Sequence, residues 1–285
     1  MRTSPRGRSL PRRICAIALG ALALALFLLW SNLSLQVSRV SLSLPGLPQG
    51  FEGTKIVVLG DSHGQWFGAG NKRLFSTVSA QEPDFIFFVG DLEDKLRGPE
   101  PHYPETMARG LSQIAPSYYV TGNHEWAIGH VRELKTRLAE GGMTVLSNAF
   151  LPLERGGDSI ILAGIDDPNG FAGQKSPEEL ARELHEAWGE PFWILLAHRN
   201  DYFSREYAAL GAGLVVSGHS HGGVIRLPFV GGIFDHDRRF FPEQEAGVYH
   251  QNGSTLFVTR GLGNSGPSFR LFNRPQVAVL TLHSS

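Results

Sequence analysis

The sequence is poor in cysteine throughout, and it is poor in acidic residues over its first fifty positions. Its one cysteine, Cys15, excludes an intrachain disulfide and a zinc site built from several thiolates. No Asp or Glu precedes Glu52, whereas five arginines precede residue 14. Residues 14–285 therefore contain 21 of the 26 basic residues and all 27 acidic ones, which gives this part of the chain a net charge of −6. A body of that sign argues against a non-specific nucleic-acid-binding protein. No His-Glu-x-x-His motif of a mononuclear zinc protease occurs.

A long uncharged segment follows the N-terminal arginines. Residues 14–30 are rich in Leu and Ala, and the next charged residue is Arg39. This length is enough for one membrane-spanning helix, and the basic flank predicts that residues 1–13 stay in the cytoplasm. We therefore expect an anchor over 14–33 and a connector over 34–52 that includes a strand near 35–44. A cleaved signal peptide of an exported protein is the alternative, although Ser31–Ser34 is a poor cleavage site.

Residues 53–285 alternate between short apolar runs and helical stretches, which predicts one α/β domain with a β-rich C-terminal part. Strands are expected at 56–59, 85–89, 118–120, 160–163, 192–197, 214–217, 255–259 and 276–282. Helices are expected at 71–81, 103–114, 128–140, 177–188 and 202–210. Ser176 followed by Pro177 and two glutamates is typical of a helix start.

Five polar blocks each follow one of these predicted strands. They are Asp61-Ser62-His63, Gly90-Asp91-Leu92-Glu93-Asp94, Gly122-Asn123-His124-Glu125, His198, and Gly218-His219-Ser220-His221. Ligands of open α/β sheets bind beyond the carboxyl ends of the strands, so we expect the blocks to meet in one crevice.

The side chains of these blocks are suited to holding two divalent cations beside a phosphate. The Asp91 carboxylate has two oxygens and can bridge two cations. A set of nitrogen and oxygen ligands without thiolate suits Mn, Fe, Zn, Co or Ni rather than Ca. Two such cations would yield a hydroxide nucleophile from a shared water. His124 is then the candidate proton donor for the leaving group, and a hydrogen bond to Asp94 could fix its tautomer.

The order D-x-H, G-D-x-x-D, G-N-H-[ED], H and G-H-x-H over Asp61 to His221 resembles the calcineurin-like metallophosphoesterase superfamily. The resemblance extends to one bacterial branch of membrane-associated or exported phosphoesterases. Members of this branch have a Gly-Gly pair after the last motif and closing stretches similar to residues 259–263 and 270–275. The resemblance implies a four-layer α/β/β/α sandwich of two mixed sheets. It also implies one metal on Asp61, His63, Asp91 and His221, and a second on Asp91, Asn123, His198 and His219. His124 would assist at the leaving group, oriented by Asp94.

The sequence departs from this branch at three positions that leave the ligands intact. Ser62 replaces a common Leu, Arg199-Asn200 follows His198 where a Pro is usual, and Val224 replaces a common Gln. Arg199 is therefore a candidate for contact with the substrate phosphate, because arginine binds phosphate oxygens bidentately. The alternative is a surface arginine paired with Asp201 or Glu206.

The sequence thus predicts a membrane-anchored, two-metal phosphohydrolase whose catalytic domain lies outside the cytoplasm of a bacterium. The resemblance favours phosphodiester or pyrophosphate cleavage over monoester cleavage. A lipid or envelope component is a candidate substrate. A lipid-facing loop could be formed by the aromatic residues 229, 234, 240 and 241 together with Ile233, Arg238 and Arg239. The alternative is that these aromatic residues belong to the core of the β-rich part. A UDP-2,3-diacylglucosamine-type pyrophosphatase and a metal-binding interaction module without turnover are the alternatives. No extended nucleic acid and no obligate protein partner are expected.

Overall fold

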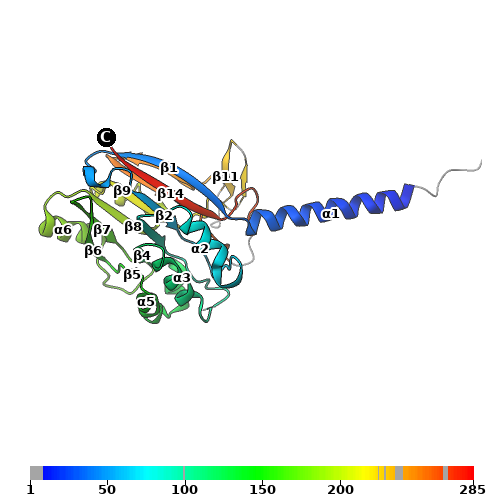
Figure 1. Cartoon of the computed structure of the whole chain (residues 1–285), viewed down its shortest axis with the longest axis horizontal. Coiled ribbons are helices and arrows are strands. Elements are labelled where there is room, and N and C mark those ends of the chain that lie inside the picture. The colour runs from blue at the N-terminus through cyan, green and yellow to red at the C-terminus, as the bar shows by residue number, and fades with distance from the viewer. Residues whose placement is uncertain (1–8, 99, 224, 228, 235–239, 266–268) are drawn as a thin grey trace, which may run out of the picture.

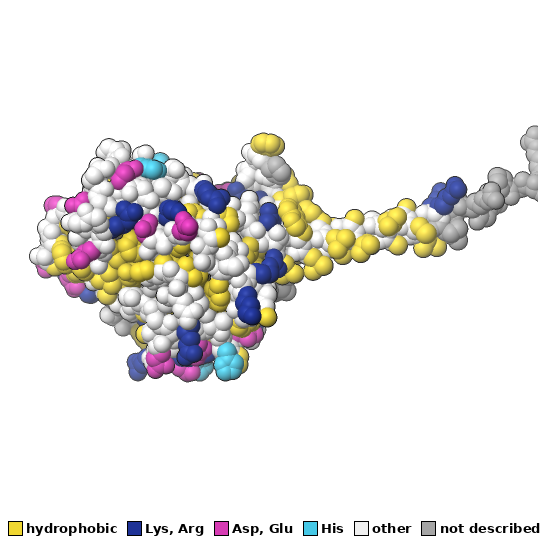
Figure 2. All heavy atoms as spheres, viewed as in Figure 1, with side chains coloured by type: hydrophobic (Ala, Val, Ile, Leu, Met, Phe, Trp, Pro, Cys, Tyr) yellow, Lys and Arg dark blue, Asp and Glu magenta, His cyan; other side chains and the backbone are white. Residues whose placement is uncertain are grey.

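The structure, a computed structural model, describes residues 9–98, 100–223, 225–227, 229–234, 240–265 and 269–285. One long helix, α1 (Ser9–Leu33), projects away from a body built on two sheets (Figure 1). Its segment Arg12–Leu33 is long and apolar enough to cross a membrane. Hydrophobic side chains cover α1 along its visible length (Figure 2). The apolar N-terminal helix expected from the sequence is therefore present.

The first sheet has six strands in the order β1-β14-β2-β3-β4-β5. These strands are β1 (Gln36–Leu44), β14 (Gln276–Ser284), β2 (Lys55–Leu59), β3 (Phe85–Val89), β4 (Ser117–Val120) and β5 (Thr144–Val145). The sheet is mixed, because β14 runs antiparallel to β2 while the other pairs are parallel. The strand within the expected connector is thus β1, which pairs with β14 along its whole length.

The second sheet also has six strands, in the order β12-β13-β9-β8-β7-β6. These are β12 (Gly247–Gln251), β13 (Ser254–Val258), β9 (Leu214–Gly218), β8 (Trp193–Arg199), β7 (Asp158–Gly164) and β6 (Ala149–Arg155). Its two outer pairs are antiparallel and its inner pairs are parallel. A separate hairpin joins β10 (Ile225–Leu227) to β11 (Gly231–Phe234).

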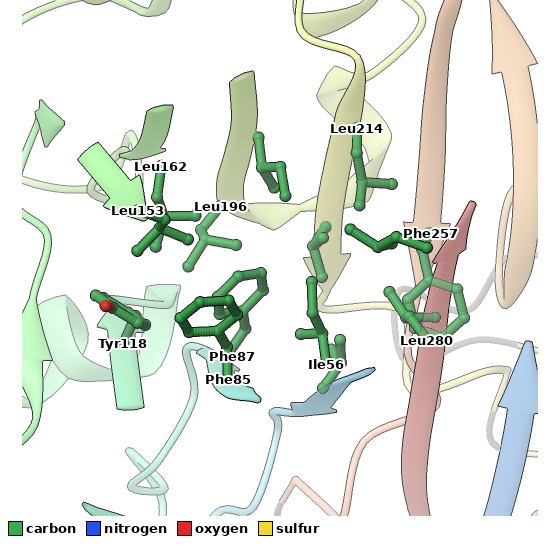
Figure 3. Close-up of a cluster of buried hydrophobic side chains, with 14 of the residues drawn as sticks. Ile56, Phe85, Phe87, Tyr118, Leu153, Leu162, Leu196, Leu214, Phe257 and Leu280 are labelled. Atoms are coloured by element: carbon green, nitrogen blue, oxygen red, sulfur yellow. The ribbon is translucent and has the colours of Figure 1, made fainter. Parts of the chain in front are cut away.

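The alternation of apolar residues along each strand explains the four layers. In β2, Ile56 and Val58 point into the core between the sheets, whereas Val57 and Leu59 pack under the helices. Figure 3 shows the inter-sheet core, where Phe87 faces Leu196 across the two sheets. Three helices cover the first sheet, α2 (Lys72–Ser79), α3 (Tyr103–Ser112) and α5 (Val131–Glu140), and α6 (Pro177–Trp188) covers the second. The predicted α/β/β/α sandwich of two mixed sheets is confirmed.

Two helix predictions differ from the structure. The segment 202–210 forms two short 3-10 turns, η3 (Asn200–Tyr202) and η4 (Tyr207–Ala209), instead of one helix. Glu206 lies between them with φ −133° and ψ −65°, outside helical geometry, while the rings on either side remain buried against the second sheet. The helix predicted at 128–140 begins later, with α5 at Val131. Ile128 still belongs to α4 (Asn123–Ile128), a helix that was not predicted and that Gly129 ends in the left-handed region at φ 87°. The predicted Ser176 cap of α6 is confirmed, since its hydroxyl accepts a hydrogen bond from the Glu179 N–H.

The last turn of α1 is hydrogen-bonded to the body. The Ser31 hydroxyl, which is buried, donates to the Arg270 carbonyl at 2.9 Å. The Asn32 amide donates to the same carbonyl at 3.1 Å and accepts from the Arg270 N–H at 2.7 Å. The helix therefore ends in a specific contact with the segment between β13 and β14.

Candidate metal centre

The polar blocks meet at one rim of the sandwich, as the strand pattern predicts. The Asp61 block follows β2, the Asp91 block follows β3, and Asn123 opens the helix after β4. His198 lies near the end of β8, and His219 and His221 follow β9. Their side chains are buried apart from Asn123, which is partly exposed. The structure thus brings all seven predicted ligand residues together from both sheets.

Several of these residues have an unusual backbone conformation. Asp61, His63, Asp91, His219 and His221 all have φ between 47° and 72°, in the left-handed region. Non-glycine residues are uncommon there, and each costs on the order of 1–3 kcal/mol unless its surroundings compensate. The surroundings do compensate for Asp61, whose carboxylate accepts the His219 N–H at 3.0 Å. Such strain at adjoining loops is typical of a functional site.

One group of ligand atoms comes from Asp61, His63, Asp91 and His221, whose donor atoms lie within 4.8 Å of one another. The Nε2 atoms of His63 and His221 are 3.1 Å apart. His63 Nε2 lies 3.7 Å from Asp91 Oδ2, and His221 Nε2 lies 3.8 Å from Asp61 Oδ1. Two imidazole nitrogens that face each other among carboxylate oxygens form the nitrogen-and-oxygen donor set that divalent transition metals prefer.

A second group comes from Asp91, His198 and His219, with Asn123 beside them. His198 Nε2 lies 3.3 Å from Asp91 Oδ2, 3.2 Å from Asn123 Oδ1 and 3.2 Å from His219 Nδ1. Its other ring nitrogen, Nδ1, donates to the Val89 carbonyl at 2.7 Å. That bond fixes the tautomer and leaves the Nε2 lone pair directed at the group, as in metal-ligating histidines. Asp91 belongs to both groups.

The electrostatics of the site follow from burial and from its close charges. Burial raises the pKa of Asp61 to about 7 and lowers the pKa of His63 to about 3. Burial alone would lower the pKa of His198, but the Asp91 and Asp61 carboxylates raise it to about 10. Burial alone would raise the pKa of Asp91, but the neighbouring histidines, among which His198 has the largest effect, hold that pKa well below its usual range. Without a cation, a proton on His198 therefore balances part of the Asp91 charge.

His124 lies beside the first group, against Asp94. Its Nε2 is 4.0 Å from Asp91 Oδ2, and its Nδ1 accepts a hydrogen bond from the Lys95 N–H at 3.1 Å. The Asp94 carboxylate comes to 3.8 Å of that Nδ1, and it accepts the Leu96 N–H at 2.7 Å. The hydrogen bond to His124 Nδ1 therefore comes from the backbone of the loop, and the Asp94 carboxylate, which the sequence suggested as the partner of His124, lies 3.8 Å from that nitrogen.

Arg199 lies next to the site and forms an ion pair with a buried aspartate. Its Nε donates to Oδ2 of the buried Asp167 at 2.8 Å, and its guanidinium lies 6.0 Å from the Tyr202 ring centre. The sequence suggested Asp201 or Glu206 as partners, and the structure instead gives Asp167.

Two buried residues have roles that sequence reasoning missed. Glu125 accepts backbone N–H bonds from Asp91, Glu93 and Gly122 at 3.0, 3.1 and 2.6 Å, which joins the loops after β3 and β4. The Arg270 guanidinium is buried, donates to the Gly263 and Arg260 carbonyls, and lies 3.4 Å from His221 Nδ1. Glu125 lies within the third block and Arg270 within the closing stretch, but their backbone partners leave no signal in the sequence.

A cavity of about 500 Å³ opens beside His219. Its lining mixes polar groups such as Asn200 and Ser204 with the aromatic rings of Phe240 and Phe241. Both rings are well exposed, so these two members of the predicted lipid-facing loop are not core residues. Residues 235–239, which include Arg238 and Arg239, lie outside the described residues.

Known proteins are similar to this chain over most of its length. The family model described as Calcineurin-like phosphoesterase matches residues 54–223. The metallophosphoesterase YkuE of Bacillus subtilis is 30% identical over 84% of this chain and 82% of its own length. A Danio rerio protein named transmembrane protein with metallophosphoesterase domain is 31% identical over 87% of this chain, which spans 57% of that relative. The crystal structure of TT1561 of Thermus thermophilus matches with a TM-score of 0.45 at 15% identity, over 72% of this chain and 88% of that one.

The family match and the buried cluster of Asp and His ligands agree with each other. Residues 54–223 contain every predicted metal ligand, and the relative from Bacillus subtilis extends the similarity over most of the chain. The chain belongs to the calcineurin-like phosphoesterase family, and it is a metal-dependent hydrolase of phosphoric esters.

Proposed function

We propose that this chain is a membrane-anchored phosphohydrolase that uses two divalent cations to cleave a phosphodiester or pyrophosphate bond outside the cytoplasm. The observation that supports two cations is the position of Asp91, whose Oδ2 lies 3.7 Å from His63 Nε2 and 3.3 Å from His198 Nε2. A carboxylate between two imidazoles is suited to bridging. One cation would be held by Asp61, His63, Asp91 and His221, and the other by Asp91, Asn123, His198 and His219. Mn, Zn, Fe, Ni and Co all suit these ligands.

When bound, two such cations polarise phosphoryl oxygens and lower the pKa of a water. His124 would supply the proton for the leaving oxygen. Because its Nδ1 accepts the Lys95 N–H, the proton of the neutral ring is on Nε2, the nitrogen nearer to Asp91. Asp94 would position this ring through the loop, since its carboxylate holds the Leu96 N–H next to Lys95. This assignment keeps the predicted role of Asp94 but makes its action indirect.

The anchor and the cavity support a substrate at or near the membrane. The apolar helix α1 and the name of the Danio rerio relative support a membrane location, and the N-terminal arginines support an extracytoplasmic body. The aromatic and polar lining of the cavity at His219 suits an amphiphilic phosphoester, such as a lipid headgroup or envelope component.

The test uses the full chain in a neutral detergent, stripped of metal and reloaded separately with Mn, Zn, Ni or Mg. We expect faster hydrolysis of an aryl phosphodiester than of the matched aryl monoester. The Asp91→Asn variant should lose both activity and metal, whereas Glu186→Gln, on the exposed face of α6, should retain both. Hydrolysis that persists in Asp91→Asn with full metal content would refute the shared carboxylate. No hydrolysis with any metal would favour the interaction module.

Arg199 is a second element of this proposal. Its Nε is held by Asp167, and its outer guanidinium nitrogens would contact a substrate phosphate. The expected result for Arg199→Ala is a higher KM for phosphodiesters with an intact metal content. An unchanged kcat/KM over several diesters would remove Arg199 from the site.

A UDP-2,3-diacylglucosamine-type pyrophosphatase remains the alternative enzyme, and it requires a site that faces the cytoplasm. A topology reporter fused after Ser285 separates the two, because a periplasm-active reporter supports the proposal and a cytoplasm-active one supports the alternative.

A further inference from the structure

A second cavity, of about 520 Å³, lies where α1 meets the body. It is lined by Trp30 of α1, by Arg226, Leu227 and Phe229 of the β10–β11 hairpin, and by Phe272 and Arg274 from the segment before β14. Figure 1 shows the hairpin standing beside the body end of α1. The cavity is lined by none of the seven predicted metal ligands, and the hydrolysis proposed above does not use it.

This cavity has an excess of positive charge. Arg226 and Arg274 line it, and Arg260 lies near both, so that burial and then the charges of these two arginines lower the pKa of Arg260 to about 10. Glu245 forms an ion pair with Arg226 at 3.4 Å. Within the described part of the chain, neither Arg260 nor Arg274 pairs with a carboxylate. A cluster of this charge is suited to an anion such as a phosphate.

The rim of the same cavity is apolar and continues the surface of the anchor. Trp30 and Phe272 are each 48% exposed, and the Phe27 and Phe272 rings are 5.0 Å apart, so the loop before β14 extends the side of α1. The Arg274 guanidinium stacks over the Trp30 ring at 4.8 Å. Tryptophan and arginine at the end of an apolar helix are typical of the membrane–water interface.

Phe229 adds a separate sign that the hairpin meets an apolar phase. Its side chain is fully exposed, and its backbone has φ 67°, a conformation that bulky residues rarely adopt. An exposed ring that is held in a strained backbone gains nothing in water. It gains transfer energy if the tip of the hairpin inserts among lipid headgroups.

We infer that this cavity binds the phosphate headgroup of an anionic phospholipid from the leaflet next to Trp30. The arginines would contact the phosphate, and the acyl chains would lie along Trp30, Phe272 and α1. A lipid accounts for the charge and the apolar rim together, whereas free phosphate accounts only for the charge. The inference goes beyond the proposed hydrolysis but relies on its membrane part, because α1 must lie in a bilayer.

The inferred site is joined to the metal centre through two residues. Arg226 Nη1 donates to the Gly222 carbonyl at 2.5 Å, and Gly222 directly follows the ligand His221. The Asn273 amide donates to the His221 carbonyl at 2.7 Å from the same segment as Phe272. A bound headgroup would therefore lie against the loop that carries a metal ligand.

The test measures lipid retention and not hydrolysis. The full-length, metal-loaded protein in a neutral detergent is equilibrated with equal amounts of phosphatidylglycerol and phosphatidylcholine, and native mass spectrometry counts the intact lipids that remain bound. Phosphatidylglycerol should be retained preferentially. Arg226→Gln should weaken that retention about five-fold, the effect of one arginine near an anionic headgroup. Phe229→Asp should lower it by a similar factor.

Arg182→Gln is the matched control, because Arg182 is an exposed arginine on α6, at the end of the body away from α1 (Figure 1). Phe229→Asp guards against misfolding, since the side chain is exposed and Asp tolerates the left-handed backbone better than Phe. Equal retention of the two lipids, or an Arg226→Gln protein that behaves like Arg182→Gln, would overturn the inference. So would displacement of phosphatidylglycerol by an equal concentration of inorganic phosphate. Alkaline carbonate extraction tests the insertion of α1 separately, so failure of the anchor and failure of the lipid site remain distinguishable.

Discussion

Replacing Glu125 by alanine tests whether one buried carboxylate holds the metal-binding loops together. Its Oε2 accepts the Gly122 and Asp91 N–H groups at 2.6 and 3.0 Å, and its Oε1 accepts the Glu93 N–H at 3.1 Å. Alanine would leave three N–H groups in a buried region without this acceptor, at about 1–3 kcal/mol each. Even the low end gives about 3 kcal/mol, which lowers the melting temperature by roughly 6–12 °C in a domain of this size.

The Glu125→Gln variant separates the hydrogen bonds from the bulk of the side chain. Its amide oxygen can replace Oε2 and keep two of the three bonds, while its NH₂ group faces the Glu93 N–H and cannot accept from it. We therefore expect a loss that is clearly smaller than in Glu125→Ala. Because Asp91 depends on the same carboxylate through its N–H, the alanine variant should also retain less metal.

The assay is thermal unfolding of wild type and both variants, with metal and with a chelator, together with metal analysis of the purified proteins. The chelated samples matter because bound metal stabilises the folded state and can mask a weakened loop. If Glu125→Ala melted with the wild type in chelator and kept its full metal content, the idea of Glu125 as the link between these loops would be wrong.

Three further predictions concern chemistry at the rim. His124→Gln should lower kcat by about 10²–10⁴ with unchanged metal content, and the loss should shrink for aryl diesters with more acidic leaving groups; a loss independent of the leaving group would contradict its role as proton donor. Gly90→Ala should destabilise the protein and weaken metal binding, since Gly90 has φ 84° and an added Cβ would lie 2.6 Å from Gly122 N and 2.8 Å from His198 Nδ1; a normally folded, metal-loaded variant would refute this. Metal uptake at about pH 8.5 should release at least one proton, because His198, with its pKa raised from 6.5 to about 10, holds a proton that a metal displaces. Calorimetry of metal binding in two buffers of different ionisation enthalpy should show this proton release. In the metal-free protein, the contribution of the His198 proton to folding stability is fully present below pH 6.5 and is lost as the pH rises through 10.

The inner strands of the two sheets were predictable because they are buried on both faces, whereas the partly exposed outer strands β5, β6 and β12 were not predicted. Runs such as 85–89 are entirely apolar, and their residues divide alternately between the two cores. The segment 202–210 was mispredicted because Phe203, Tyr207 and Ala208 have helical spacing, while the non-helical backbone at Glu206 depends on packing against the second sheet. A local pattern cannot register that long-range contact.

The ligand types of the site could be predicted because they are visible in short local blocks of the sequence. Each block carries its own chemistry and each follows a strand, so their convergence depends only on the sheet order. The functions of Glu125 and Arg270 could not be predicted, because their partners are backbone N–H and carbonyl groups of other loops, which carry no residue-specific signal. The inward pairing of Arg199 with Asp167 was likewise hidden, since 31 residues separate them in the chain.

The contact between α1 and Arg270 determines where the protein can be shortened. A cut between Trp30 and Ser31 would keep the hydrogen bonds of Ser31 and Asn32 and would leave β1 on the sheet. A cut at Leu44 would remove β1, expose the edge of β14, and free Arg274 from the carbonyls of Ser34 and Leu35. Proteolytic release from a membrane would thus yield a stable soluble enzyme only if the protease acts inside the last turn of the helix, because an earlier cut leaves the apolar span of α1 on the body.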